Sequence, residues 1–317
     1  MNPERIREHQ WHNALQSVLL IGAMTALLGL VGWIVAGPDG LVLGLLACGL
    51  LSVLGIRISP RLVLRLYRAR PIPARAAPDL HRVLEILCQR AGLVWVPQLY
   101  YVPTPVLNAF AVGHRDEAAI ALTDGLLQRL GSRELVAVLA HELSHVRHND
   151  MWVMNLADLI SRVTVALSQV GLLLLLLGLP LALLGMVSLS LPALLLLILA
   201  PTLMALLQLA LSRTREYEAD RGAVELTGDP RALASALYQL ERHQGGWLER
   251  VLMPGRREPD PALLRSHPAT EDRIARLREL AHEERRHPPG LVRPPTALDD
   301  FPRPGRRPRW HLNGLWY

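Results

Sequence analysis

Hydrophobic residues along the 317-residue chain are gathered into long uncharged runs. Two of these runs, Ser17–Ala36 and Leu41–Ile56, flank the turn-forming segment Gly37–Gly40. A third uncharged stretch, residues 163–211, is too long for one crossing of a hydrocarbon core about 30 Å thick, which takes about 20 helical residues. Helix-breaking residues divide it near its middle, namely Pro180, Gly185 and Pro192. The pattern predicts four transmembrane helices, paired as hairpins over residues 17–58 and 163–211.

The placement of positive charge predicts the orientation of these helices. The chain carries 34 Lys and Arg residues, all of them Arg, against 28 Asp and Glu residues, for a net charge of +6. Arginines follow and precede both hairpins, whereas the two hairpin turns contain none. Because positively charged flanks stay on the cytoplasmic side, we expect both termini and all polar segments to be cytoplasmic, with the helices in the inner (plasma) membrane. Contact with the lipid bilayer accounts for the charge, and no nucleic-acid-binding motif is present, so we expect no nucleic-acid partner.

Two polar segments, residues 59–162 and 212–286, contain the remaining structure, with a short N-terminus (1–16) before them and a Pro- and Arg-rich tail (287–317) after them. Amphipathic patterns predict helices, which we place at residues 79–92, 132–146, 213–227, 230–244 and 270–286. Short apolar segments at residues 98–102, 107–113 and 118–123 predict a small antiparallel meander. The predicted fold class is a mainly α membrane protein with this small sheet. The two cysteines, Cys48 and Cys88, predict neither a disulfide framework nor thiol chemistry.

One predicted helix carries the motif His141-Glu-Leu-Ser-His145. Residues four apart lie on the same side of a helix, so both imidazoles can bind one Zn²⁺ ion. Glu142 can take a proton from a water molecule that the zinc has acidified, which is the chemistry of peptide hydrolysis. The alternative is a chance match on an amphipathic helix, because His-Glu-x-x-His also occurs in unrelated chains.

A catalytic zinc site needs a third protein ligand. Met151 stands where a metzincin would have its third histidine, which excludes that class. Farther along the chain, Glu216 and Asp220 share a helix face, whereas Glu218 points nearly opposite. One of the two carboxylates can bind the metal while the other accepts a hydrogen bond from a ligand histidine. The alternative is an ordinary charged helix face paired with the neighbouring arginines. Two membrane crossings between His145 and Glu216 would bring both residues to the same side.

This ordered set of motifs resembles the HtpX-type membrane zinc metalloproteases, distant relatives of the CAAX prenyl endopeptidases. The motifs are His141–His145, Glu216–Asp220 after a transmembrane hairpin, Asn108–Gly113, and Ser266–Pro268 followed by Arg273, within residues 17–280. The resemblance implies a cytoplasmic, gluzincin-like protease domain formed by residues 59–162 and 212–286. It implies one Zn²⁺ per chain, with Glu216 rather than Glu218 as the third ligand. It also implies quality control of misfolded or damaged membrane proteins as the role, with unfolded or membrane proteins as substrates.

Three further residues are weaker candidates. Asn108 and Phe110 lie in a segment that can form a sheet edge and bind an extended peptide through its main chain, or they belong to a turn and to the core. His267 can stabilise the oxyanion of the reaction, or it is a residue of a helix-entry loop. A non-catalytic membrane scaffold with a vestigial metal site remains an alternative function, although the intact Glu142 argues against it. A transporter is disfavoured because residues 17–36 and 163–211 contain no Asp, Glu, Arg or His.

Overall fold

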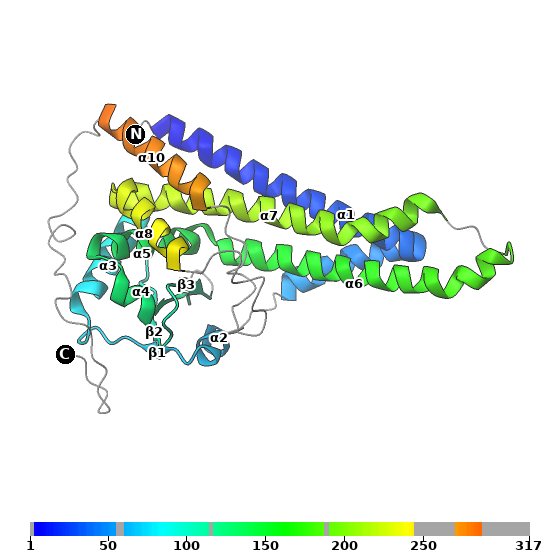
Figure 1. The fold of residues 1–317 in the computed structure, drawn as a ribbon, viewed down its shortest axis with the longest axis horizontal. Helices are drawn as coiled ribbons and strands as arrows, with labels where there is room; N and C mark the ends of the chain where they lie inside the picture. Colours follow the sequence, from blue (N-terminus) through cyan, green and yellow to red (C-terminus); the bar gives the residue numbers. More distant parts are fainter. Residues whose placement is uncertain (1–2, 55–59, 114–116, 187–189, 244–269, 287–317) are drawn as a thin grey trace. The chain divides into compact units, whose positions relative to one another are not determined.

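The computed structural model describes residues 3–54, 60–113, 117–186, 190–243 and 270–286 (Figure 1). These residues are mainly helical and form two compact units. The polar unit contains the described residues within 1–5, 58–151 and 215–317, and the apolar unit contains those within 6–57 and 152–214. Two long helices, α6 (Asp150–Leu183) and α7 (Leu191–Thr227), continue from one unit into the other. The segment with His267 and the tail at 287–317 lie outside the described residues.

The apolar unit contains three helices that are long and apolar enough to cross a membrane, among the described residues. The first, α1 (Pro3–Leu54), holds both N-terminal apolar runs and is interrupted by non-helical backbone at Ala36 and Gly37. Met24 and Cys48, on opposite sides of this interruption, are buried in one cluster with Ile160 of α6 and Met204 of α7. The two halves of α1 therefore contribute to the same apolar cluster, while the predicted transmembrane hairpin stays a prediction.

The membrane-type helices extend beyond the predicted spans. Helix α6 starts at Asp150, ahead of the uncharged stretch, and α7 continues through the predicted helix at 213–227 without a break. Leucines of α6 are exposed along its apolar part, for example Leu176 (65% exposed) and Leu177 (67% exposed), as expected of a helix surface that contacts lipid. The apolar sequence pattern predicted only the part of each helix whose composition suits the hydrocarbon core of a membrane.

In the polar unit the structure confirms the remaining predicted helices to within two residues at either end. They are α3 (Pro78–Ala91), α5 (Ser132–His148), α8 (Pro230–His243) and α10 (Thr270–Arg286). Two short helices, α2 (Pro60–Leu66) and α4 (Asp124–Arg129), were not predicted. Helix α3 has Pro78 in its first turn and ends at Gly92 in the left-handed conformation, the arrangement that these two residues favour.

The sheet is mixed, and the predicted antiparallel meander is wrong. The strands are β1 (Arg70–Pro71), β2 (Gln98–Val102), β3 (Ala109–Val112) and β4 (Ala119–Thr123), in the order β1-β2-β4-β3. Strand β4 is parallel to β2 and antiparallel to β3, so it lies between strands that precede it in the sequence. The β2–β3 connection passes over the end of β4 at Gly125, where a Cβ atom would lie 2.1 Å from the Pro105 carbonyl oxygen.

Helix α5 lies at the centre of the polar unit's core. Its residues Leu139 and Leu143 are fully buried in a cluster with Leu84 of α3, Ile120 of β4 and Leu233 of α8. Burial on several sides fixes both the axial position and the rotation of α5. The side chains on its remaining face are therefore held in defined directions.

Candidate active site

The two histidines of the motif lie on this fixed helix, near its C-terminal end. His141 is buried, and His145 is partly buried. Helix α5 ends at Asn149, which adopts the left-handed conformation (φ 56°) and donates its backbone N–H to the carbonyl oxygens of His145 and Val146. This turn reverses the chain and brings the next residue, Asp150, back to the His145 ring.

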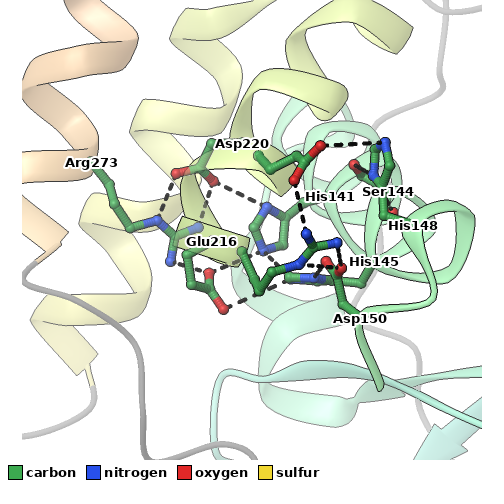
Figure 2. Close-up of polar contacts among 10 residues, drawn as sticks. His141, Ser144, His145, His148, Asp150, Glu216, Asp220 and Arg273 are labelled. Carbon is green, nitrogen blue, oxygen red and sulfur yellow. Dashed lines mark hydrogen bonds and ion pairs between the residues drawn. The ribbon is translucent and has the colours of Figure 1, made fainter. Parts of the chain in front are cut away.

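Helix α7 approaches α5 closely enough to complete the cluster. At Gly222 a Cβ atom would lie 2.2 Å from the Ser144 hydroxyl oxygen and 3.0 Å from the Ser144 Cβ atom. Glycine and serine therefore allow the two helices to approach more closely than larger side chains would. Helix α7 consequently presents Glu216 and Asp220 to the histidines of α5 (Figure 2).

Three ligand atoms converge as a metal site requires. The Nε2 atoms of His141 and His145 are 3.1 Å apart, and Glu216 carboxylate oxygens lie 3.5 and 3.8 Å from these two nitrogens, respectively. Nitrogen ligands of a tetrahedral zinc ion, each about 2.0–2.1 Å from the metal, are themselves about 3.3 Å apart. The donor set and its spacing therefore fit a metal ion, with one donor atom from each residue.

The other nitrogen of each histidine faces a carboxylate. His141 Nδ1 lies 3.0 Å from Asp220 Oδ1, and His145 Nδ1 lies 2.8 Å from Asp150 Oδ2. A carboxylate on Nδ1 directs Nε2 towards the metal and makes it a stronger ligand. The structure thus places Asp220 where the sequence predicted an orienting carboxylate, whereas Asp150 was not predicted. In the sequence, Asn149 is a residue type that tolerates a left-handed helix end, but this does not show which side chain the turn brings back.

Two buried arginines hold these carboxylates. Arg273 of α10 donates to both oxygens of Asp220, at 2.7 and 2.5 Å, and its Nη1 atom lies 2.9 Å from Glu216 Oε2. Arg215 of α7 donates to Asp150 Oδ1 through Nε (2.6 Å) and through Nη2, and its Nη1 atom lies 3.1 Å from Glu218. Glu218 therefore belongs to a second set of contacts, away from the ligand atoms.

The neighbouring carboxylates raise the pKa of each histidine above its usual value. Burial lowers the pKa of His141, but hydrogen bonds and charge from Asp220 and Glu216 outweigh burial and raise it to about 10. Burial likewise opposes the charged form of His145, and its contact with Asp150 raises the pKa above the usual value. Because a metal binds only the neutral imidazole, protons compete with a metal for these nitrogens.

The remaining candidates occupy different environments. Glu142 follows His141 on α5 and is partly exposed. Phe110 is 5% exposed, with its ring centroid 5.2 Å from that of Tyr67, so its side chain is part of the core. The main chain of Asn108 exchanges hydrogen bonds with Thr123, next to the edge strand β3. A substrate-binding role of either residue stays a prediction, as does the role of His267 outside the described residues.

Comparisons with known proteins identify the family of the chain and its relatives. The family model described as peptidase family M48 matches residues 74–281. The chain is 34% identical over 302 residues to the Protease HtpX homolog of Paraburkholderia phytofirmans, covering 86% of this chain and 99% of that protein. It is 36% identical over 292 residues to the Protease HtpX homolog of Ralstonia pickettii, covering 85% and 97%. Ste24p of S. mikatae, a solved structure, is 20% identical with a TM-score of 0.43, covering 85% of this chain and 66% of that one.

These findings define the class of protein as a membrane-bound metalloprotease. The chain belongs to peptidase family M48, and its similarity to the HtpX homologues extends over most of its length. The resemblance seen in the sequence motifs is therefore confirmed.

Proposed function

We propose that the chain is a zinc-dependent endopeptidase with His141, His145 and Glu216 as the metal ligands. The convergence of two imidazole nitrogens and one carboxylate within 4.8 Å carries this proposal. Two histidines and a glutamate are a ligand set typical of catalytic zinc, which leaves a fourth position for water or substrate. Cations such as Mg²⁺ and Ca²⁺ prefer all-oxygen sites, so they fit this donor set less well.

The side chains around the metal have distinct roles in peptide hydrolysis. When bound, the zinc ion acidifies water and polarises the carbonyl group of the substrate. Glu142, directly after the first ligand in the helix, accepts the proton of the attacking water and passes it to the leaving amine. Asp220 and Asp150 hold the imidazoles in the tautomer that leaves Nε2 free to bind the metal. Arg273 keeps Asp220 and Glu216 in place through its buried guanidinium group.

Metal analysis and one variant test this proposal. The full-length protein, purified in detergent without chelator, should contain close to one zinc ion per chain and should cleave an unfolded substrate such as casein. Glu142→Gln should keep the zinc and lose the cleavage, because only the proton acceptor is removed. Zinc binding with no cleavage in the unsubstituted protein would favour a non-catalytic scaffold. A protein that neither contains nor rebinds zinc would contradict the proposal.

We further propose a multi-pass topology in the inner membrane with four crossings and a cytoplasmic polar unit, acting on misfolded or damaged membrane proteins. The reversal within α1 and the absence of arginine from the hairpin turns support this orientation. Single cysteines at Met186 (72% exposed, after α6) and Tyr238 (56% exposed, on α8) can test it in a cysteine-free background. An impermeant maleimide should label position 186 in intact spheroplasts and position 238 only after permeabilisation. The reverse result would overturn the orientation.

A further inference from the structure

Asp150 and Arg215 stand at the two places where the chain passes between the units. The chain leaves the polar unit after Met151 and returns to it at Arg215. Asp150 is 3% exposed and Arg215 is 8% exposed, and the guanidinium group donates to the Asp150 carboxylate through two nitrogens. A buried ion pair within the polar unit therefore joins the two ends of the segment 152–214, which belongs to the apolar unit.

This pair also joins the two segments that carry the metal ligands. Asp150 contacts the ring of His145 through Oδ2 (2.8 Å) and Arg215 through Oδ1, so one carboxylate serves both partners. Arg215 directly precedes Glu216, whose carboxylate faces His145 Nε2 at 3.8 Å. Any displacement of α7 from α5 at this point would therefore move Glu216 and release the carboxylate that orients His145.

From this arrangement we infer that Asp150 and Arg215 are positioning residues for the proposed zinc site, and that they act as one unit. The Asp220–Arg273 pair cannot replace them, because it holds His141 and is anchored on α10. Glu218 supports Arg215 from the other side (Nη1 to Oε2, 3.1 Å), so the guanidinium group is held at both ends. The buried contact of two guanidinium nitrogens with Asp150 Oδ1 aligns the ligand set before a metal binds.

Zinc affinity tests the inference, which rests on the proposed zinc site. Asp150→Asn, Arg215→Lys and the double variant would be made in the full-length protein, stripped with chelator in detergent and titrated with Zn²⁺ against a chromophoric competitor. Asp150→Asn should weaken zinc binding by about 10–100-fold, the usual effect of losing a group that orients a ligand. Arg215→Lys keeps the charge but loses the contact of two guanidinium nitrogens with Asp150, so its zinc affinity should also fall. The double variant should be no weaker than the worse single variant, because each substitution already breaks the unit.

A matched pair elsewhere in the polar unit provides the control. Arg133 donates to Asp229 through Nε (3.0 Å) and Nη2 (2.5 Å), but the Arg133 side chain is 69% exposed and lies at the opposite end of α5 from His145. Arg133→Lys should leave the zinc affinity within about twofold of the unsubstituted protein, since exposed ion pairs contribute little.

Two further measurements separate positioning from general stability. In the Co²⁺-loaded protein, Asp150→Asn and Arg215→Lys should change the visible absorption of the metal, because the His145 ring turns. Thermal unfolding of the metal-free variants reports any loss of fold. An unchanged cobalt spectrum, or zinc affinity within twofold of the original, would overturn the inference even if the unfolding temperature falls. If Asp150→Asn does not fold, the milder Arg215→Lys decides by the same criteria. Absence of zinc binding by the unsubstituted protein would instead contradict the proposed function.

Discussion

Glu216 and Glu218 flank Tyr217 on α7, and replacing each carboxylate in turn by an amide tests which of the two binds the metal. Glu216 oxygens lie 3.5 and 3.8 Å from the two histidine Nε2 atoms, whereas Glu218 contacts Arg215 at 3.1 Å and His148 at 3.9 Å. Glu216→Gln keeps the side-chain volume, and its amide oxygen can still accept a hydrogen bond from Arg273. The substitution therefore removes a metal ligand with little other disturbance.

The expected loss of zinc affinity in Glu216→Gln can be worked out from the contribution of one ligand to the free energy of zinc binding. Structural zinc sites with four protein ligands bind with about 10–16 kcal/mol, so one ligand contributes roughly 3 kcal/mol. Zinc affinity of Glu216→Gln should fall by about 10²–10³-fold, and peptidase activity at limiting zinc should fall with it. Glu218→Gln should keep zinc affinity within about tenfold, because it only weakens the support of Arg215.

The assay is a zinc titration of the stripped full-length protein against a chromophoric competitor, with thermal unfolding of the metal-free form as a check on the fold. Asp220 continues to bind Arg273 through two hydrogen bonds in the Glu216 variant, so its unfolding temperature should stay close to the original. If Glu218→Gln loses zinc while Glu216→Gln retains it, the assignment of the third ligand is wrong.

Three other predictions concern packing, reactivity and pH. Gly222→Ala should destabilise the protein by about 1–3 kcal/mol in thermal unfolding because its Cβ would overlap the Ser144 hydroxyl, whereas Gly178→Ala, with open space around it, should not destabilise it. With Cys48 replaced by Ala, the thiol of Cys88 (1% exposed) should react with N-ethylmaleimide at pH 8 only after unfolding, because burial raises its pKa to about 12; rapid labelling of the folded protein would contradict this. Apparent zinc affinity should rise about 10–100-fold per pH unit from pH 6 to 8, since the pKa of His141 is raised to about 10 and binding releases one or two protons; a flat profile would contradict it.

Helical periodicity predicted which residues of the site share a helix face, whereas Glu216 as the third ligand was implied by the resemblance to known proteases. His141 and His145 are four residues apart, as are Glu216 and Asp220, and each pair shares one helix face in the structure. The even number of predicted crossings between the pairs placed them on the same side of the membrane. Their contact is now visible, while their roles in catalysis remain predictions.

What the sequence could not predict depends on backbone geometry outside regular elements. Asp150 reaches His145 only because Asn149 adopts a left-handed conformation, and helical periodicity does not extend past such a turn. The sequence also did not predict the order of the strands, because the alternation of apolar and polar residues along one strand does not show which strands pair with it. The β2–β3 connection crosses at Gly125, and that crossing inserts β4 between the earlier strands.

The buried charged groups of the site carry an excess of negative charge, which a divalent metal ion can balance. Among the described residues, every buried Asp, Glu and Arg side chain belongs to this cluster: Asp150, Arg215, Glu216, Glu218, Asp220 and Arg273. Four carboxylates and two guanidinium groups leave two negative charges, and an uncompensated buried charge costs several kcal/mol. A dication bound by neutral histidines supplies the missing two positive charges. Without the metal, protons bound to the histidines offset part of this negative charge, which is why the pKa of each imidazole is raised although burial opposes it. A divalent metal bound by neutral histidines can therefore replace these protons and balance the two remaining carboxylate charges.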